Sequence, residues 1–447
     1  MNELQTTLFG IEENIKQTKL DISEWGTFKD SLKAPVHGWF TYPAGFSYKA
    51  VENSISRFGI KSGDRIYDPF MGSGTTNIVA KSLGINSYGV EAHPFVIDIT
   101  KTKLYWDIYS NEILDLLKDI ESNLKEWNNQ RPENLKEFLK NQFPELITKC
   151  FLDETLYELL GVRNFILQFD NKIELKRFLR TALICTLRDV SIAATGWPYI
   201  APNKIKITSM SKKGFETFKN TCLKMVGDLS IIKQKALKKE SEHVIELGDS
   251  RFTNFPSDSA DHIFTSPPYL NNFDYADRTR LEMYFMGDAK DWGDISKDVR
   301  TKLMTSATTQ ISRTDPKYKF NEELKYSCPN EYEFLKNAVD ELSILRNQKG
   351  GKKSYDLLTT GYFNDIYAIL KDNFRILKKG SKALYILGDS APYGVHIPTD
   401  ELIGKLGVGI GFSKYSIEIL RTRGGKWKDN PQRHNVALRE TVVILEK

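Results

Sequence analysis

The chain has 447 residues, 40% of them hydrophobic and 27% charged, which is typical of a globular protein built from two or three cooperating units. This composition excludes a disordered or collagen-like chain, and every apolar run is shorter than the roughly 18 to 20 residues of a membrane span. The N-terminus lacks the basic-then-apolar layout of a secretory signal, so we expect a cytoplasmic protein.

Charge and cysteine content restrict the function only weakly. Lys and Arg number 63 and Asp and Glu 58, a formal net charge of +5 that allows a polyanionic partner without requiring one. The cysteines are far apart, form no CxxC pair and have no histidine cluster nearby: Cys150, Cys185, Cys222 and Cys328. We therefore expect reduced thiols, no disulfide frame and no metal site.

The first predicted elements form a βαβ unit. From Gly63 the sequence reads GDRIYDPFMGSGTTNIVAKSLG and then INSYGVEAHP, a short strand, a glycine turn, a helix and a second strand. Residues 95–242 then carry apolar residues three and four apart, as in NEILDLLKDIESNLKEW, and are expected to be all-helical.

Strands return in HVIELGD and ADHIFTSPPY, before a polar stretch that reads as an excursion from the sheet. The C-terminal part contains a helix at FNDIYAILKDNFRILKKG, the strand KALYILGD, the helix TDELIGKLGVGIGF and two strands near YSIEILRT and ALRETVVILE. The short spacing of these last strands favours an antiparallel pair at one edge of the sheet.

The expected fold is therefore α/β, a doubly wound, mostly parallel sheet with an antiparallel edge strand and two insertions. Its expected parts are 30–94, the first part of the core with the glycine turn; 95–242, a helical insertion; 243–270, core; 271–360, a polar insertion; and 361–447, the C-terminal part of the core.

The glycine turn lies where doubly wound sheets bind ligands, at the carboxyl end of a strand. It consists of Asp68, Pro69, Phe70, Met71, Gly72, Ser73, Gly74, Thr75 and Thr76. The run lacks the GxxxxGK[ST] pattern of ATPases and the third glycine of a dinucleotide fingerprint, which favours a nucleoside ligand without pyrophosphate. A purely structural tight turn is the alternative.

Glu91 ends the next strand, where an acid can accept hydrogen bonds from both hydroxyls of a ribose. Taken alone it would be read as a solvated strand-end glutamate, but the glycine turn some twenty residues upstream favours the ribose role.

A stiff loop, Ser266-Pro267-Pro268-Tyr269, follows the strand that ends in HIFT. Two successive prolines fix two φ angles and remove two N–H donors, so carbonyl acceptors are left without competing donors. Such a loop suits the exocyclic amino group of a nucleobase, and Tyr269 would stack on the face of that base. The target nucleotide must then leave its stack. A proline loop that merely closes a strand is the alternative.

Together, DPFMGSGTT and TSPPY resemble the paired signatures of the amino-group DNA methyltransferases, which use S-adenosylmethionine to methylate cytosine N4 or adenine N6. The resemblance is strong at these two sites and weaker over the sheet, where it implies a Rossmann-like methyltransferase core. It does not extend to the two insertions. Either insertion could contact DNA and read its sequence.

The resemblance assigns roles by position. It implies that the tetrad Ser266, Pro267, Pro268 and Tyr269 is catalytic. It implies cofactor contacts at Asp68, Pro69, Phe70, Gly72, Ser73, Gly74, Thr75, Thr76, Glu91, Ala92, Asp249 and Ser250, and more loosely at Tyr42, Pro43, Ala44, Gly45 and Phe46. Serine at the first tetrad position resembles the cytosine-N4 members more than the adenine-N6 members.

The implied cofactor is S-adenosyl-L-methionine, and the implied partners are double-stranded DNA and a cognate restriction endonuclease encoded nearby, as in restriction–modification systems. A nucleoid-associated protein follows from that substrate. Phosphate contacts are expected in the basic stretch RTRGGKWKDNPQRH, at Arg421, Arg423, Lys426, Lys428 and Arg433.

Three other functions stay open on the sequence. They are adenine-N6 methylation of DNA, methylation of an RNA amino group, and a catalytically silent DNA-binding specificity subunit. The last is disfavoured by the intact glycine turn, Glu91 and tetrad. No cysteine lies in the Pro-Cys setting of ring-carbon methylation, so no covalent intermediate is expected.

Overall fold

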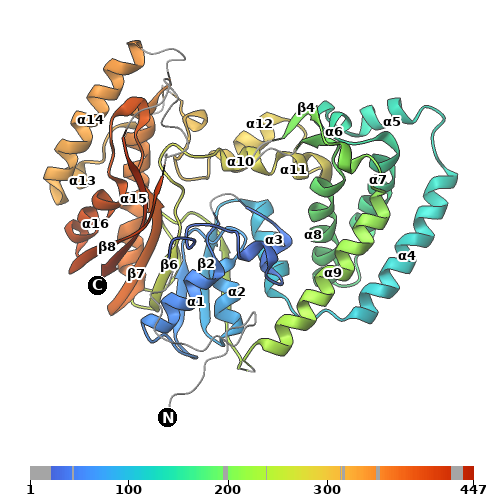
Figure 1. Ribbon diagram of the computed structural model, residues 1–447, viewed down its shortest axis with the longest axis horizontal. Coiled ribbons are helices and arrows are strands. Elements are labelled where there is room, and N and C mark those ends of the chain that lie inside the picture. Colours follow the sequence, from blue (N-terminus) through green and yellow to red (C-terminus); the bar gives the residue numbers. More distant parts are fainter. Residues whose placement is uncertain are drawn as a thin grey trace.

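The computed structural model describes residues 22–42, 45–194, 200–237, 239–312, 314, 318–348, 353–423 and 436–447. Within them, seven strands form one sheet in the order β5-β2-β1-β6-β7-β9-β8 (Figure 1). Their bounds are β1 (Arg65–Asp68), β2 (Asn86–Glu91), β5 (His243–Leu247), β6 (Ala260–Thr265), β7 (Leu377–Gly388), β8 (Lys414–Arg423) and β9 (Leu438–Glu446).

Five of these strands, from β5 to β7, run parallel, and β9 is antiparallel to both β7 and β8. The doubly wound, mostly parallel α/β sheet is thereby confirmed, with the expected antiparallel pair at one edge. The reversed strand β9 lies one position in from that edge, because β8 returns beside it and takes the outermost position.

Successive residues of the central strands alternate between two hydrophobic clusters, one on each face of the sheet. Ile66 packs with α1 (Tyr48–Arg57) and α2 (Thr75–Ser82), whereas Tyr67 packs on the side of α15 (Tyr355–Ile376) and α16 (Thr399–Ile410). This follows from the two-residue period of a strand. Burial on both faces explains why the core strands read as short apolar runs.

A helical block lies beside the sheet, on the side away from β8 (Figure 1). Its helices are α4 (Ser110–Asn129), α5 (Leu135–Gln142), α6 (Glu145–Cys150), α7 (Asp153–Gln168), α8 (Ile173–Val190) and α9 (Gly214–Lys235). The region also contains β3 (Ala193–Ala194) and β4 (Ala201–Ile205), an antiparallel pair that the all-helical expectation missed. Helix α3 (Pro94–Leu104) contacts β2 and β5 and so joins the block to the core.

The polar insertion divides between two parts of the molecule. Its first helices, α10 (Tyr275–Arg278), α11 (Arg280–Met286) and α12 (Trp292–Ile295), bury their apolar residues with the helical block. Its later helices, α13 (Glu322–Ser327) and α14 (Pro329–Gln348), pack with α15 and α16. Short helical turns complete the chain: η1 (Ser31–Lys33), η2 (His37–Trp39), η3 (Ile207–Ser209), η4 (Ser296–Arg300), η5 (Thr308–Gln310) and η7 (Pro392–Gly394).

Helix α15 begins at Tyr355 rather than at Phe363, where apolar periodicity placed its start. The added turns contain Thr359, Thr360 and Gly361, all weak helix formers. Gly361 admits the ring of Tyr318, since a Cβ there would lie 2.9 Å from Cε1 of that ring. Tertiary packing therefore overrides local propensity at this point. Among the described helices, none combines the length and apolar character needed to cross a bilayer.

Candidate functional site

The glycine turn adopts backbone angles that require glycine. Gly72 and Gly74 have φ values of 52° and 88°, in the left-handed region that side chains disfavour. A Cβ on Gly74 would also lie 2.6 Å from Cγ2 of Thr100 on α3. The hydroxyl of Thr100 donates to the Gly72 carbonyl over 2.8 Å, so α3 supports the turn from behind.

Asp68 connects the glycine turn to the proline loop. Its Oδ1 accepts hydrogen bonds from Phe70 N at 3.0 Å and from the Thr265 hydroxyl at 2.6 Å, and its Oδ2 accepts from the Thr76 hydroxyl at 2.8 Å. Burial raises the pKa of this carboxyl to about 6, while the three donors favour its ionised form. Asp68 is fully buried, so it holds the two loops together from beneath.

The two loops meet at one cavity, which holds about 860 Å³ of empty space, counted with the part open to solvent. The expected residues on its wall are Tyr42, Gly45, Phe46, Pro69, Phe70, Gly72, Ser73, Thr75, Glu91, Ala92, Asp249, Ser250, Ser266 and Pro268. Those absent from the wall are Asp68, Gly74, Thr76, Pro267 and Tyr269, and Pro43 and Ala44 lie outside the described residues.

Glu91 lies at the carboxyl end of β2 and faces the cavity. Its Oε1 accepts from the backbone N–H of His93 at 2.8 Å. Burial raises the pKa of Glu91 to about 7, opposed by the N–H groups of His93, Gly72 and Ala92. The side chain is thus a buried hydrogen-bonding group whose charge changes near neutral pH.

The segment Gly248-Asp249-Ser250-Arg251, which follows β5, contributes to the cavity wall. The Ser250 hydroxyl donates to the Pro69 carbonyl and so braces the glycine turn. Both carboxylate oxygens of Asp249 accept from the Arg251 guanidinium, over 2.9 and 2.6 Å. Arg251 also reaches Asp365 on α15 at 2.7 Å. Asp249 therefore lies at the cavity with its carboxylate already in an ion pair.

The two ends of the proline loop differ in their surroundings. The Ser266 hydroxyl is buried, belongs to a residue of the cavity wall, and has no hydrogen-bond partner among the described residues. Such a group is rare and points to a partner supplied by a ligand. Tyr269 instead donates its hydroxyl to Oε1 of Glu440 on β9, over 2.8 Å.

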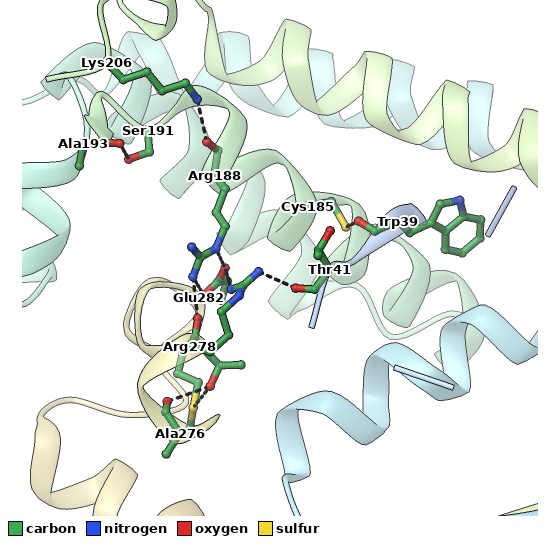
Figure 2. A network of polar contacts seen from close by, with 12 residues as sticks. Trp39, Thr41, Cys185, Arg188, Ser191, Ala193, Lys206, Ala276, Arg278 and Glu282 are labelled. Carbon is green, nitrogen blue, oxygen red and sulfur yellow. Dashed lines mark hydrogen bonds and ion pairs between the residues drawn. The ribbon is translucent and has the colours of Figure 1, made fainter. Parts of the chain in front are cut away.

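A buried ion network links the helical block to the cavity (Figure 2). Glu282 of α11 has no exposed side-chain surface and pairs with Arg188 of α8 at 2.5 Å and with Arg278 of α10 at 3.1 Å. Arg278 also donates to the carbonyl of Thr41 over 2.7 Å. Thr41 immediately precedes the cavity residue Tyr42, so the network fixes the backbone there.

The comparisons with known proteins agree with this geometry. The N6/N4 methyltransferase family model, described as DNA methylase, matches residues 11–102, which include the glycine turn and Glu91. The Type II methyltransferase M.BsoBI of Geobacillus stearothermophilus is 28% identical over 94% of this chain and 87% of its own length. M.AvaI of Nostoc sp. is 27% identical over 94% and 88%, and M.MvaI of Kocuria varians 23% identical over 88% and 85%.

These similarities support an amino-group DNA methyltransferase. The three similarities extend over most of the chain, including both insertions, which the sequence signatures did not reach. In this chain the polar insertion takes part in the cavity, because Tyr275, Lys302, Leu303 and Met304 line it. Nothing in the spacing of these residues indicates that they lie at the glycine turn, since only the fold of α10 to η4 brings them there.

Only some of the residues expected to contact DNA lie in the described part of the chain. Arg421 and Arg423 end β8, whereas Lys426, Lys428 and Arg433 lie outside the described residues. Arg421 donates from Nε to Oε2 of the buried Glu440 over 2.6 Å, with 42% of its side chain exposed.

Proposed function

We propose that this chain transfers the methyl group of S-adenosyl-L-methionine to the exocyclic amino group of a base flipped out of double-stranded DNA, with cytosine N4 favoured. The observation that carries this proposal is the single cavity walled by the glycine turn, Glu91 and the Ser266-Pro268 loop. The similarity to enzymes named as Type II methyltransferases supports a site-specific DNA substrate, and with it a cognate restriction endonuclease as partner.

The donor set of the cavity fits the cofactor. S-adenosyl-L-methionine would supply a methyl group activated on a sulfonium centre. Glu91 would accept hydrogen bonds from the ribose hydroxyls, and the left-handed Gly72 lets the backbone approach closely. Tyr42, Gly45 and Phe46 would enclose the methionine end, and Asp249 and Ser250 would lie near the adenine.

The acceptor side would be formed by the tetrad. The carbonyls of Ser266, Pro267 and Pro268 would accept the amino hydrogens of the base, and the Ser266 hydroxyl has no other described partner. Tyr269 would stack on the extruded base, whose flipping costs a few kcal/mol. In-line placement of nitrogen, methyl and sulfur is then the main catalytic task. Serine at the first tetrad position supports cytosine N4.

Digestion of methylated DNA to nucleosides tests the proposal. Purified protein, radiolabelled S-adenosyl-L-methionine and duplex DNA of mixed sequence should yield N4-methylcytosine, identified by mass spectrometry. Ser266→Ala should lower the single-turnover rate about 10- to 100-fold, since the reacting group loses a positioning contact, while cofactor affinity stays near that of the wild type. N6-methyladenine would correct the base, and labelling of RNA alone would contradict the DNA substrate.

Glu91 gives the proposed cofactor site a pH dependence. Its pKa is raised to about 7 by burial, and the ionised carboxylate has more acceptor sites for two ribose hydroxyls than the neutral acid. Cofactor affinity should therefore increase with pH up to about 7 and level off above it, by up to about tenfold per pH unit. Titration calorimetry at a series of pH values measures this dependence.

Stability should change in the opposite direction. A folded-state pKa above the ordinary glutamate value of 4.5 means that Glu91 stabilises the fold below pH 4.5 and that this contribution is lost as the pH rises through about 7. Glu91→Gln is the control for the binding measurement. It should bind the cofactor more weakly than the wild type, with an affinity that does not change with pH. A wild-type pH dependence in that variant would assign the titration to another group, such as Asp68.

A further inference from the structure

The tetrad tyrosine is anchored by a residue far from it in the sequence. Tyr269 and Glu440 are 171 positions apart, yet the tyrosine hydroxyl donates to Oε1 of the glutamate over 2.8 Å. Both are buried, with 7% and 2% of their surface exposed. Because a tyrosine side chain has only two main rotatable bonds, fixing its hydroxyl nearly fixes the plane of its ring.

Glu440 is in turn held by Arg421. The two residues are direct neighbours across the antiparallel β8–β9 pair, and Nε of Arg421 donates to Oε2 of Glu440 over 2.6 Å. Each carboxylate oxygen thus has its own donor, the tyrosine on one side and the guanidinium on the other. A buried carboxylate requires such partners, and a charge-assisted hydrogen bond is stronger and more directional than a neutral one.

The segment before the glycine turn is shaped to leave room for this carboxylate. A Cβ built on Gly26 would lie 2.5 Å from both Cδ and Oε2 of Glu440, closer than any real contact. Gly26 has no positive φ that would itself demand glycine. The missing side chain at this position therefore serves the placement of Glu440.

We propose that Glu440 is a positioning residue for methyl transfer, which holds the ring of Tyr269 at the angle at which it meets the flipped base. The proposal rests on the proposed function. It assigns Glu440 no contact with cofactor or base, only the hydrogen bond that it accepts from Tyr269. It gives the antiparallel ribbon β8–β9 a role in catalysis through Arg421.

Three substitutions test the role of Glu440 in the full-length protein. Glu440→Ala removes both hydrogen bonds, and Glu440→Gln keeps an acceptor for Tyr269 but turns an amide toward Arg421. Gly26→Ala pushes the carboxylate away without changing any charge. Single-turnover methyl transfer to duplex DNA should fall about 10- to 100-fold in Glu440→Ala, as expected for a misplacement of the order of 1 Å, and less in the other two. Cofactor affinity should stay within about twofold of wild type in all three.

Glu418 provides a matched control on the same strand as Arg421. It pairs with Arg57 of α1 through two hydrogen bonds of 2.8 and 2.6 Å but does not contact the proline loop. Glu418→Gln should leave the transfer rate unchanged. In the Tyr269→Phe background, which lacks the hydroxyl, Glu440→Ala should have little further effect, whereas a purely structural role would give the same loss in both backgrounds.

The outcomes separate the two proposals. Wild-type rates in both Glu440→Ala and Gly26→Ala would overturn the positioning role and leave the proposed function intact. Equal losses with and without the Tyr269 hydroxyl would also overturn it. Absence of methyl transfer by the wild-type protein would count against the proposed function itself. If Glu440→Ala does not fold, the transfer rate of Gly26→Ala still tests the positioning role, since this variant keeps both Glu440 and its ion-pair partner Arg421.

Discussion

Replacing Asp68 with alanine is expected to lower the methyl-transfer rate at least about 100-fold. This carboxylate joins the glycine turn to the end of β6, directly before the proline loop, through Phe70 N, Thr76 and Thr265. Its loss would leave Phe70 N and the Thr265 hydroxyl without this acceptor, while Thr76 keeps the Phe264 carbonyl, and would allow the two loops to shift relative to each other. Methyl transfer between two bound molecules depends on the distance between the two loops that would hold them. Single-turnover kinetics with labelled cofactor measures the effect.

Two milder variants distinguish positioning from direct cofactor contact. Thr265→Val removes only the donor at the end of β6, directly before the proline loop, so it should lower the transfer rate and leave cofactor affinity unchanged. Asp68→Asn keeps the size and one acceptor oxygen, so its loss should be smaller than that of Asp68→Ala. If Asp68 instead bound the cofactor directly, Asp68→Asn would weaken cofactor binding while Thr265→Val kept the full rate.

The sheet could be predicted from the sequence because each of its core strands has a recognisable local pattern. HIFT and ALYILG are short apolar runs followed by turn residues, and burial on both faces of a parallel sheet produces that pattern. The position of β9 between β7 and β8 was not predictable in this way. The spacing of the last two strands indicates that they pair, but says nothing about which of them pairs with β7.

The part of the cavity wall that the two motifs form could be predicted from the sequence. The part that the polar insertion contributes could not. Both motifs follow strands of one parallel sheet, so their carboxyl ends lie at the same edge. Tyr275 and Lys302 reach the same cavity from the polar insertion, whose folding depends on burying LEMYFM against the helical block. The role of Glu440 was also hidden, because a glutamate in an edge-pair strand reads as a solvated residue.

The helical block and the cavity are connected by charges rather than by apolar packing alone. Arg188 comes from α8, Glu282 from α11 and Arg278 from α10, and the last of these also holds the Thr41 carbonyl (Figure 2). Next to Arg278, the Thr279 hydroxyl lies 2.7 Å from Nε2 of His93, two residues beyond Glu91. Helix α10 thereby meets the block, the segment before Tyr42 and the end of β2.

Glu282→Ala is expected to lower the free energy of unfolding by about 3 to 5 kcal/mol, the range for breaking a buried ion pair from one side. Burial by itself would raise the pKa of Glu282, but Arg188 and Arg278 outweigh burial and lower it. A lowered folded-state pKa means that this stabilisation is present above pH 4.5, the ordinary glutamate pKa, and is lost as the pH falls through the folded-state value. Urea denaturation near neutral pH measures the loss.

Glu154 is the control, because it pairs with Arg131 on the exposed surface of the same block and its replacement by alanine should leave the unfolding midpoint unchanged. Glu282→Gln should fall between the wild type and Glu282→Ala. Below its unfolding temperature, Glu282→Ala should also bind the cofactor more weakly, since Arg278 would no longer be held against Thr41. The expected loss reflects the removal of the buried carboxylate that pairs with Arg188 and Arg278, so a wild-type midpoint in Glu282→Ala would mean that the network adds no net stability.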